Sequence, residues 1–330
     1  LGDVYKRQAI YNDGTLNNIT NSNFTGNNAV TNGEASTTGN GGAIYNASGK
    51  TINITNNSFS GNKAGEAGGA VYNAGTITIS GNTFKGNSAS KGGAVYNNDT
   101  LNIAENTFEA NSADFGGALY NSASGKISAI QGTFNANTAV SDGGALYNIG
   151  SINTIGGSFT NNKAANKGGA VYNTGKLDKI ANASFSSNST TADNGMGGAI
   201  YNSQASNKLT VEETNFNSNK SANGGAIATD GALDITNSTF TQNSASGNGG
   251  AIYNIKNTTN INSSTFTSNS AVNGGAVAND STINISNSKF NDNSASANGG
   301  AVYNKGNLTV TDSEFTNNSA VKGGAIYSEG

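Results

Sequence analysis

The acidic residues are the leading candidates for catalysis in this chain, because glycoside hydrolysis needs two carboxylates held several ångströms apart. Glu212 and Glu213 are the only adjacent acidic pair, but neighbouring residues of a strand point to opposite faces. Asp230 and Asp280 hold equivalent places in the segments GGAIATD and GGAVAND. Two repeats separate them, which is about 9.6 Å at the usual strand spacing and too far for sharing one cation. We therefore expect these acids to lie on a solvated surface.

Other catalytic groups are missing from the composition. The chain has no histidine and no cysteine, and its sole arginine is Arg7, which excludes His-dependent acid–base catalysis and leaves no Arg within the repeats for a lyase mechanism. No acidic residue recurs in every repeat, as a calcium-binding roll requires. We predict that the protein is not an enzyme, that it has no catalytic or metal-ligating residues, and that it uses no cofactor.

Tyrosine is the most regularly placed residue that could contact a partner. Eleven of the twelve tyrosines follow an aliphatic residue in Ala-(Ile/Val/Leu)-Tyr segments, and alternation puts each Tyr on the face opposite that aliphatic residue. The aliphatic position is never polar, whereas Ala228 and Ala278 replace Tyr, so we predict that the aliphatic residue points inward and Tyr outward. If Tyr instead points inward, it belongs to the core and no stripe exists. The candidate surface-binding stripe consists of Tyr45, Tyr72, Tyr96, Tyr120, Tyr147, Tyr172 and Tyr201.

The elements that position these residues are internal repeats. A Gly-Gly-Ala-aliphatic signature recurs at intervals of 24 to 29 residues, starting at Gly41, Gly68, Gly92, Gly116, Gly143, Gly168, Gly197, Gly224, Gly249, Gly274, Gly299 and Gly323. A Phe-x-x-Asn signature lies between successive copies. A fixed period of this size is typical of a solenoid, propeller or array.

Each repeat reads as three short strands. Segments such as Ile77-Thr78-Ile79 and Leu308-Thr309-Val310 alternate with period two, a Phe follows about five residues later, and Ala-(Ile/Val/Leu)-Tyr-Asn makes the third strand. One repeat cannot bury its apolar face alone, so equivalent strands must pair in parallel with the next repeat. We predict an all-β, right-handed, single-stranded parallel β-helix, a solenoid of about 12 to 13 coils.

Two further columns of side chains follow from this stacking. We expect a structural phenylalanine stack inside the solenoid, formed by Phe59, Phe84, Phe108, Phe134, Phe159, Phe185, Phe216, Phe240, Phe266, Phe290 and Phe315. We expect a structural asparagine ladder at a turn, where side-chain amides bond to one another and to backbone. Its members are Asn62, Asn87, Asn111, Asn137, Asn162, Asn188, Asn219, Asn243, Asn269, Asn293 and Asn318.

Departures from the period predict local irregularities and the chain's boundaries. Two residues rather than one separate the aliphatic pairs in four repeats, Ile127 with Ile130 and Leu177 with Ile180 among them, which predicts bulges. Extra length at residues 28–40 and 189–196 predicts loops at one edge. Residues 1–8 lack an initiating Met and are unlike the repeats, so we expect a non-native leader. Residues 9–330 are expected to form one continuous β-helix domain, truncated at both ends.

The paired signatures resemble the polymorphic outer membrane protein repeats of chlamydial autotransporters, and similar arrays occur in adhesin-like surface proteins of other bacteria and of methanogenic archaea. The resemblance covers residues 9–330. It implies a surface-displayed right-handed β-helix used for adhesion to cells, matrix or neighbouring microbes. The resemblance does not extend to the C-terminal membrane barrel of the chlamydial proteins.

We therefore expect an extracellular, cell-surface adhesin-like stalk whose partners are host or microbial surface glycans or proteins. The alternative is a polysaccharide-active enzyme or a carbohydrate-binding β-helix, because lyases and hydrolases also use this fold. The net charge of −3 gives no surface for nucleic acid. No membrane insertion by this segment is expected, and the fragment should be monomeric, with open ends that could stack.

Overall fold

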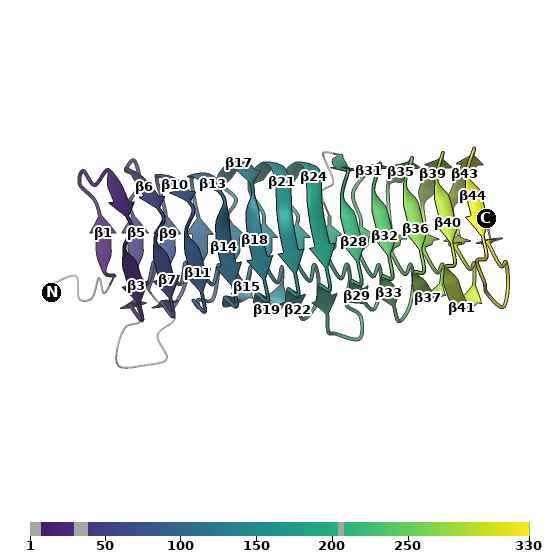
Figure 1. Cartoon of the computed structure of the whole chain (residues 1–330), viewed down its shortest axis with the longest axis horizontal. Coiled ribbons are helices and arrows are strands. Elements are labelled where there is room, and N and C mark those ends of the chain that lie inside the picture. The colour runs from purple at the N-terminus through teal and green to yellow at the C-terminus, as the bar shows by residue number, and fades with distance from the viewer. Residues whose placement is uncertain (1–7, 30–38, 204–207, 330) are drawn as a thin grey trace. The chain divides into compact units, whose positions relative to one another are not determined.

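The computed structural model describes residues 8–29, 39–203 and 208–329. Within these ranges the only regular secondary structure is the β-strand. The prediction of an all-β parallel β-solenoid is confirmed (Figure 1). The chain divides into two compact units, residues 1–153 and 154–330, and the strand β21 (Ser151–Thr160) contains the boundary. In one parallel sheet, five successive strand pairings connect β1 to β20 in the first unit, and six connect β23 to β45 in the second. One continuous body over residues 9–330 stays a prediction.

The first unit repeats four kinds of strand. The tyrosine strands are β1 (Ile10–Asn12), β5 (Ile44–Asn46), β9 (Val71–Asn73), β12 (Val95–Asn97), β16 (Leu119–Asn121) and β20 (Leu146–Asn148). The aliphatic strands are β2 (Asn18–Thr20), β6 (Thr51–Thr55), β10 (Thr76–Ser80), β13 (Thr100–Ala104) and β17 (Lys126–Ile130). The phenylalanine strands are β3 (Asn23–Thr25), β7 (Ser58–Ser60), β11 (Thr83–Lys85), β14 (Asn106–Glu109) and β18 (Gly132–Asn135). Short edge strands follow them, namely β4 (Asn28–Ala29), β8 (Lys63–Ala64), β15 (Ser112–Phe115) and β19 (Thr138–Asp142).

The second unit repeats the same four kinds. Its tyrosine strands are β23 (Val171–Asn173), β26 (Ile200–Asn202), β30 (Ile227–Thr229), β34 (Ile252–Asn254), β38 (Val277–Asn279), β42 (Val302–Asn304) and β45 (Ile326–Ser328). The long strand β24 (Lys176–Ser186) joins an aliphatic and a phenylalanine segment. The later aliphatic strands are β27 (Leu209–Glu212), β31 (Leu233–Thr236), β35 (Thr258–Asn262), β39 (Thr282–Ser286) and β43 (Asn307–Thr311). The later phenylalanine strands are β28 (Asn215–Asn217), β32 (Thr239–Thr241), β36 (Thr265–Thr267), β40 (Lys289–Asn291) and β44 (Glu314–Thr316). The edge strands are β22 (Lys163–Ala164), β25 (Ser189–Thr190), β29 (Lys220–Ser221), β33 (Ser244–Ala245), β37 (Ser270–Asn273) and β41 (Ser294–Asn298).

Parallel register aligns like residues from coil to coil. Ile77 pairs with Leu101, and Phe84 pairs with Phe108. The alternating strand β10 buries both of its isoleucines and leaves its threonines and serine partly exposed, as a strand with one face on a dry interior should. The interior of each unit is therefore built from columns of identical or similar side chains.

The glycine pair of each repeat is required where coils approach closely. Gly68 has a φ of 65°, and a Cβ on Gly69 would lie 2.0 Å from the carbonyl oxygen of Gly93 in the next coil. Only glycine adopts the first conformation freely and fits the second space. The first glycine of each Gly-Gly signature has a positive φ, so the signature marks a tight corner in the coils that carry it.

Two of the expected bulges lie in the strands β17 and β24. Ile127 and Ile130 are both buried while Ser128 and Ala129 between them are exposed, and the regular register of β13 with β17 ends at Ile127. Leu177 and Ile180 are likewise both buried in β24. Of the expected loops, residues 189–196 contain the two-residue strand β25 followed by turns, whereas residues 30–38 of the other loop lie outside the described residues, as do residues 1–7 of the expected leader.

Candidate binding surface

Tyrosine rings form a continuous column along the tyrosine strands of the first unit. Its members are Tyr11, Tyr45, Tyr72, Tyr96, Tyr120 and Tyr147, and successive ring centroids lie 4.8 to 5.1 Å apart with interplanar angles of 5° to 12°. From Tyr45 onward, the aliphatic residue that precedes each tyrosine, such as Val71 or Val95, is fully buried on the opposite face of the strand. The strands therefore carry one column on each face.

The tyrosine column presents ring edges rather than ring faces. Each ring inside the column has another ring against both of its faces, because near-parallel rings about 5 Å apart are in contact. Most members are half-buried, Tyr120 is 8% exposed and Tyr11 at one end is 37% exposed. A partner approaching the middle of the column would therefore meet phenol edges, which carry groups that both donate and accept hydrogen bonds.

Burial changes the ionisation of these phenols. The pKa of Tyr72 is raised to about 12 by desolvation, reinforced by the neighbouring Tyr96 and Tyr45 and by Glu66. Desolvation also raises the pKa of Tyr120 to about 12, with Tyr147 and Tyr96 adding to the effect. Tyr72 and Tyr120 are therefore neutral at physiological pH, so their hydroxyls can donate hydrogen bonds.

The column is interrupted twice in the second unit. Ala228 and Ala278 stand in register with tyrosines and are buried. In both places an aspartate two residues after the alanine accepts a hydrogen bond from the hydroxyl of the tyrosine one coil earlier. Tyr201 donates to Asp230 at 2.7 Å, and Tyr253 donates to Asp280 at 2.5 Å.

The two aspartates therefore accept hydrogen bonds from tyrosines of the second unit. Lys305 lies 3.8 Å from Asp280, and Lys167 donates to the Tyr201 hydroxyl at 3.2 Å and lies over its ring. The remaining stacked pairs of this unit are looser, with centroids 5.6 Å apart for Tyr172 and Tyr201 and 6.0 Å apart for Tyr303 and Tyr327.

The phenylalanines lie on the inside. Successive ring centroids in each unit are 4.6 to 5.1 Å apart and nearly parallel. The rings from Phe59 to Phe290 are at most 1% exposed. Phe115, which falls outside the repeat signature, packs edge-on against Tyr147 with centroids 5.4 Å apart.

The asparagines of Phe-x-x-Asn are fully hydrogen-bonded in the interior. Within each unit the amide nitrogen of one donates to the amide oxygen of the next at 2.9 to 3.0 Å. The same nitrogen also donates to the carbonyl of a phenylalanine one coil back, as Asn87 does to Phe59 at 3.0 Å. Buried amides satisfied in this way stabilise the stack and are closed to an outside ligand.

Sequence reasoning missed two further ladders. The Asn of the tyrosine strands bonds to its successor at 2.8 to 2.9 Å in the first unit, as with Asn46 and Asn73. A third ladder joins Asn57, Asn82 and Asn106 at the turn between the aliphatic and phenylalanine strands. Alternation carried a signal for the first of these, because Asn73 stands two residues after the inward Val71 and so shares its face.

One break in the second ladder leaves a buried amide oxygen without a hydrogen-bond partner. Thr229 replaces Asn, and its hydroxyl bonds to the carbonyl oxygens of Asn202 and Gly231. The amide oxygen of Asn254 in the next coil is then unpaired, as is the hydroxyl of the buried Thr259 in the following strand.

The acids considered for chemistry do not converge. Glu212 pairs with Lys179 on the outer face, and Glu213 follows in a turn with a φ of 48°. Among residues 8–29, 39–203 and 208–329, no group of three or more His, Cys, Asp or Glu residues could hold a metal ion. The same ranges contain no helix that is long and apolar enough to cross a membrane.

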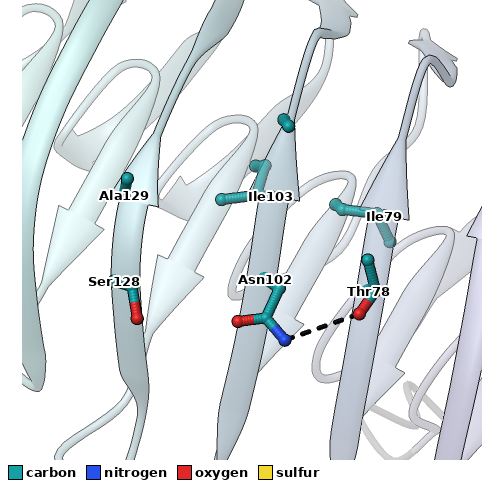
Figure 2. Close-up of a pocket in the computed structure, with 7 residues that line it drawn as sticks. Thr78, Ile79, Asn102, Ile103, Ser128 and Ala129 are labelled. Carbon is teal, nitrogen blue, oxygen red and sulfur yellow. Dashed lines mark hydrogen bonds between the residues drawn. The ribbon is translucent and has the colours of Figure 1, made fainter.

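A shallow hollow of about 200 Å³ lies across the neighbouring strands β10, β13 and the bulged β17 (Figure 2). Asn102 donates to the Thr78 hydroxyl at 3.4 Å along its rim. The hollow has no titratable side chain, so it offers no acid–base chemistry. Its lining residues are Thr78, Ile79, Asn102, Ile103, Ala104, Ser128 and Ala129.

Comparison with known proteins identifies the repeat. The family model of the Chlamydia polymorphic membrane protein repeat matches five segments, residues 58–74, 156–174, 237–255, 287–305 and 312–329. Searches of curated proteins and of solved structures found no match. Each matched segment runs from a phenylalanine segment through the next tyrosine strand, and so includes one asparagine of the Phe-x-x-Asn ladder. The chain is therefore a β-solenoid in which five segments are similar to the Chlamydia polymorphic membrane protein repeat.

Proposed function

We propose that this chain is a non-enzymatic, surface-displayed adhesin-like segment that attaches to glycans or proteins of host or microbial surfaces. The repeats support surface display, because the family that shares them is named for a membrane protein of Chlamydia. The phenylalanines and the asparagines of Phe-x-x-Asn are taken up as scaffold, because they are buried and stacked or hydrogen-bonded in columns. The half-exposed tyrosine column is the recurrent feature that remains available to a partner.

The column supports binding through many equivalent weak contacts. Its phenol groups recur at the 4.8 to 5.1 Å spacing of the rings. Because ring faces inside the column are covered by neighbours, the partner is held by hydrogen bonds to hydroxyls and by ring edges rather than by stacking on a sugar face. An extended partner can engage several coils at once, so that individually weak contacts add up to useful avidity.

A glycan array and a cell-binding assay test this proposal with a triple variant, Tyr72→Phe, Tyr96→Phe and Tyr147→Phe. This variant keeps the stacked rings and removes three hydroxyls from the exposed edge. Tyr253→Phe is the matched control, because the Tyr253 hydroxyl already donates a hydrogen bond to Asp280. We expect the triple variant to lose binding and the control to retain it. Unchanged binding by a correctly folded triple variant would remove the column as the contact surface.

A further inference from the structure

We propose that the tyrosine column of the first unit is a site of oxidative cross-linking, where hydrogen peroxide and a haem peroxidase couple tyrosines of consecutive coils into dityrosine. This inference concerns a covalent modification of the column and does not depend on what the column binds. It rests on how closely and how regularly the rings are held.

The rings are already arranged as coupling partners. Tyr45, Tyr72 and Tyr96 stand in direct register on paired parallel strands. Their rings are almost parallel and 4.8 to 5.0 Å apart, so that equivalent ring atoms of neighbours face one another. Backbone pairing holds each pair together, which replaces a bimolecular encounter by a local one. Since the outer edges of these rings are exposed, an oxidant can reach them and the rings can tilt toward each other.

The reaction balances with one equivalent of peroxide. Each of two phenols loses one electron and one proton to give a phenoxyl radical. The two radicals join through ring carbons next to the oxygens, and the hydrogens on those carbons move to the oxygens to restore both phenols. Hydrogen peroxide accepts the two electrons and two protons and is reduced to two water molecules. The product is a carbon–carbon bond between consecutive coils.

The second unit contains an internal control. Tyr253 has Ala228 and Ala278 as its register neighbours in the adjacent coils, so no tyrosine ring stacks against it from one coil away. Its hydroxyl is also held by Asp280. If proximity in the column governs coupling, Tyr253 should remain unmodified under conditions that cross-link the first unit.

The experiment treats the full chain in dilute solution with a haem peroxidase and limiting hydrogen peroxide. The monomeric fraction is isolated, digested and analysed for dityrosine peptides by mass spectrometry. We expect links between tyrosines one coil apart, such as Tyr72 with Tyr96, and none to Tyr253. Photolysed ruthenium trisbipyridyl with persulfate serves as a small second oxidant in case the peroxidase cannot reach the column. Absence of dityrosine from the monomer with both oxidants, or coupling of Tyr253 as often as the others, would overturn the proposal.

Two variants sharpen the test. Tyr96→Phe keeps a stacked ring but removes two of the five adjacent pairs of the first unit, so links at residue 96 should vanish while Tyr45 with Tyr72 and Tyr120 with Tyr147 still couple. Tyr253→Phe should leave the dityrosine yield unchanged. Ala278→Tyr restores the residue found at this place in other coils and should bring Tyr253 into cross-links. A folded Ala278→Tyr variant in which Tyr253 stays unlinked would contradict the role of register proximity.

Discussion

Removing one rung of the asparagine ladder should destabilise the first unit far more than removing an exposed asparagine of the same coil. The Asn111 side chain makes four hydrogen bonds. Its nitrogen donates to the Phe84 carbonyl at 3.0 Å and to the Asn137 amide oxygen at 2.9 Å. Its oxygen accepts from the backbone and side-chain nitrogens of Asn87, both at 2.9 Å. Asn111 is 0% exposed, so water cannot replace these bonds.

The magnitude follows from the number of bonds. Each buried hydrogen bond contributes about 0.5 to 1.5 kcal/mol net, and a buried group left without any partner costs about 1 to 3 kcal/mol. Asn111→Ala deprives the Asn87 backbone N–H of its acceptor in addition to breaking the other three bonds. We therefore expect a loss of about 3 to 5 kcal/mol in the free energy of unfolding. The matched control is Asn102→Ala, because Asn102 is exposed and has only a 3.4 Å contact with Thr78.

Urea unfolding followed by circular dichroism measures the difference. Because repeat proteins can unfold in segments, amide hydrogen exchange at Asn87 should be followed as well, and we expect its protection to fall in Asn111→Ala alone. If Asn111→Ala and Asn102→Ala differ by less than about 0.5 kcal/mol, a size usual for exposed substitutions, the ladder does not hold the coils together.

Three other predictions follow from the columns of stacked side chains. Thr229→Asn should raise the stability of the second unit by about 1 kcal/mol in urea titrations, since it would supply a donor to the unpaired amide oxygen of Asn254. A decrease would show that this break in the ladder does not lower the stability of the second unit. Phe240→Ala should cost about 3 to 5 kcal/mol, because it opens a void between rings 4.7 and 4.6 Å away, whereas Thr241→Ala on the outer face should cost little. Alkaline pH should destabilise the first unit, because the pKa of Tyr72 rises from 10.0 in the unfolded chain to about 12 when folded. Its contribution is complete below pH 10 and is lost as the pH rises toward 12, and phenolate absorbance that titrates near pH 10 without unfolding would refute this.

The repeat signatures were sufficient to predict the solenoid, because each of its strands is marked by a residue that recurs at the same place. Ile77 and Ile79 alternate with polar residues, and Phe84 recurs one coil later as Phe108. The stacking of like side chains then needs only parallel pairing in register. Doubled spacing between Ile127 and Ile130 likewise indicated a bulge, since both must reach the interior.

Contacts that cross from one coil to the next between unlike residues could not be read in the same way. The bond from Tyr201 to Asp230 depends on where the aspartate lies relative to a tyrosine 29 residues earlier, and sequence alone gave only that Asp230 and Asp280 are equivalent. The unpaired oxygen of Asn254 arises because Thr229 turns its hydroxyl to backbone carbonyls, a choice set by local geometry. The face-to-face packing of the tyrosines, which hides their faces, also appears only once the rings are placed.

In-register stacking of the coils is tested most directly by distances between spin labels, for which the chain is suited because it has no native cysteine. Outward positions of the phenylalanine strands stand in register from Ser186 through Asn217, Thr241, Thr267 and Asn291 to Thr316. Cysteine pairs that combine Thr316 with Thr241, Asn217 or Ser186 should give label separations of about 14, 19 and 24 Å, rising by about 4.8 Å per coil. Separations that do not increase with the number of intervening coils, or that scatter broadly, would contradict the stacked solenoid.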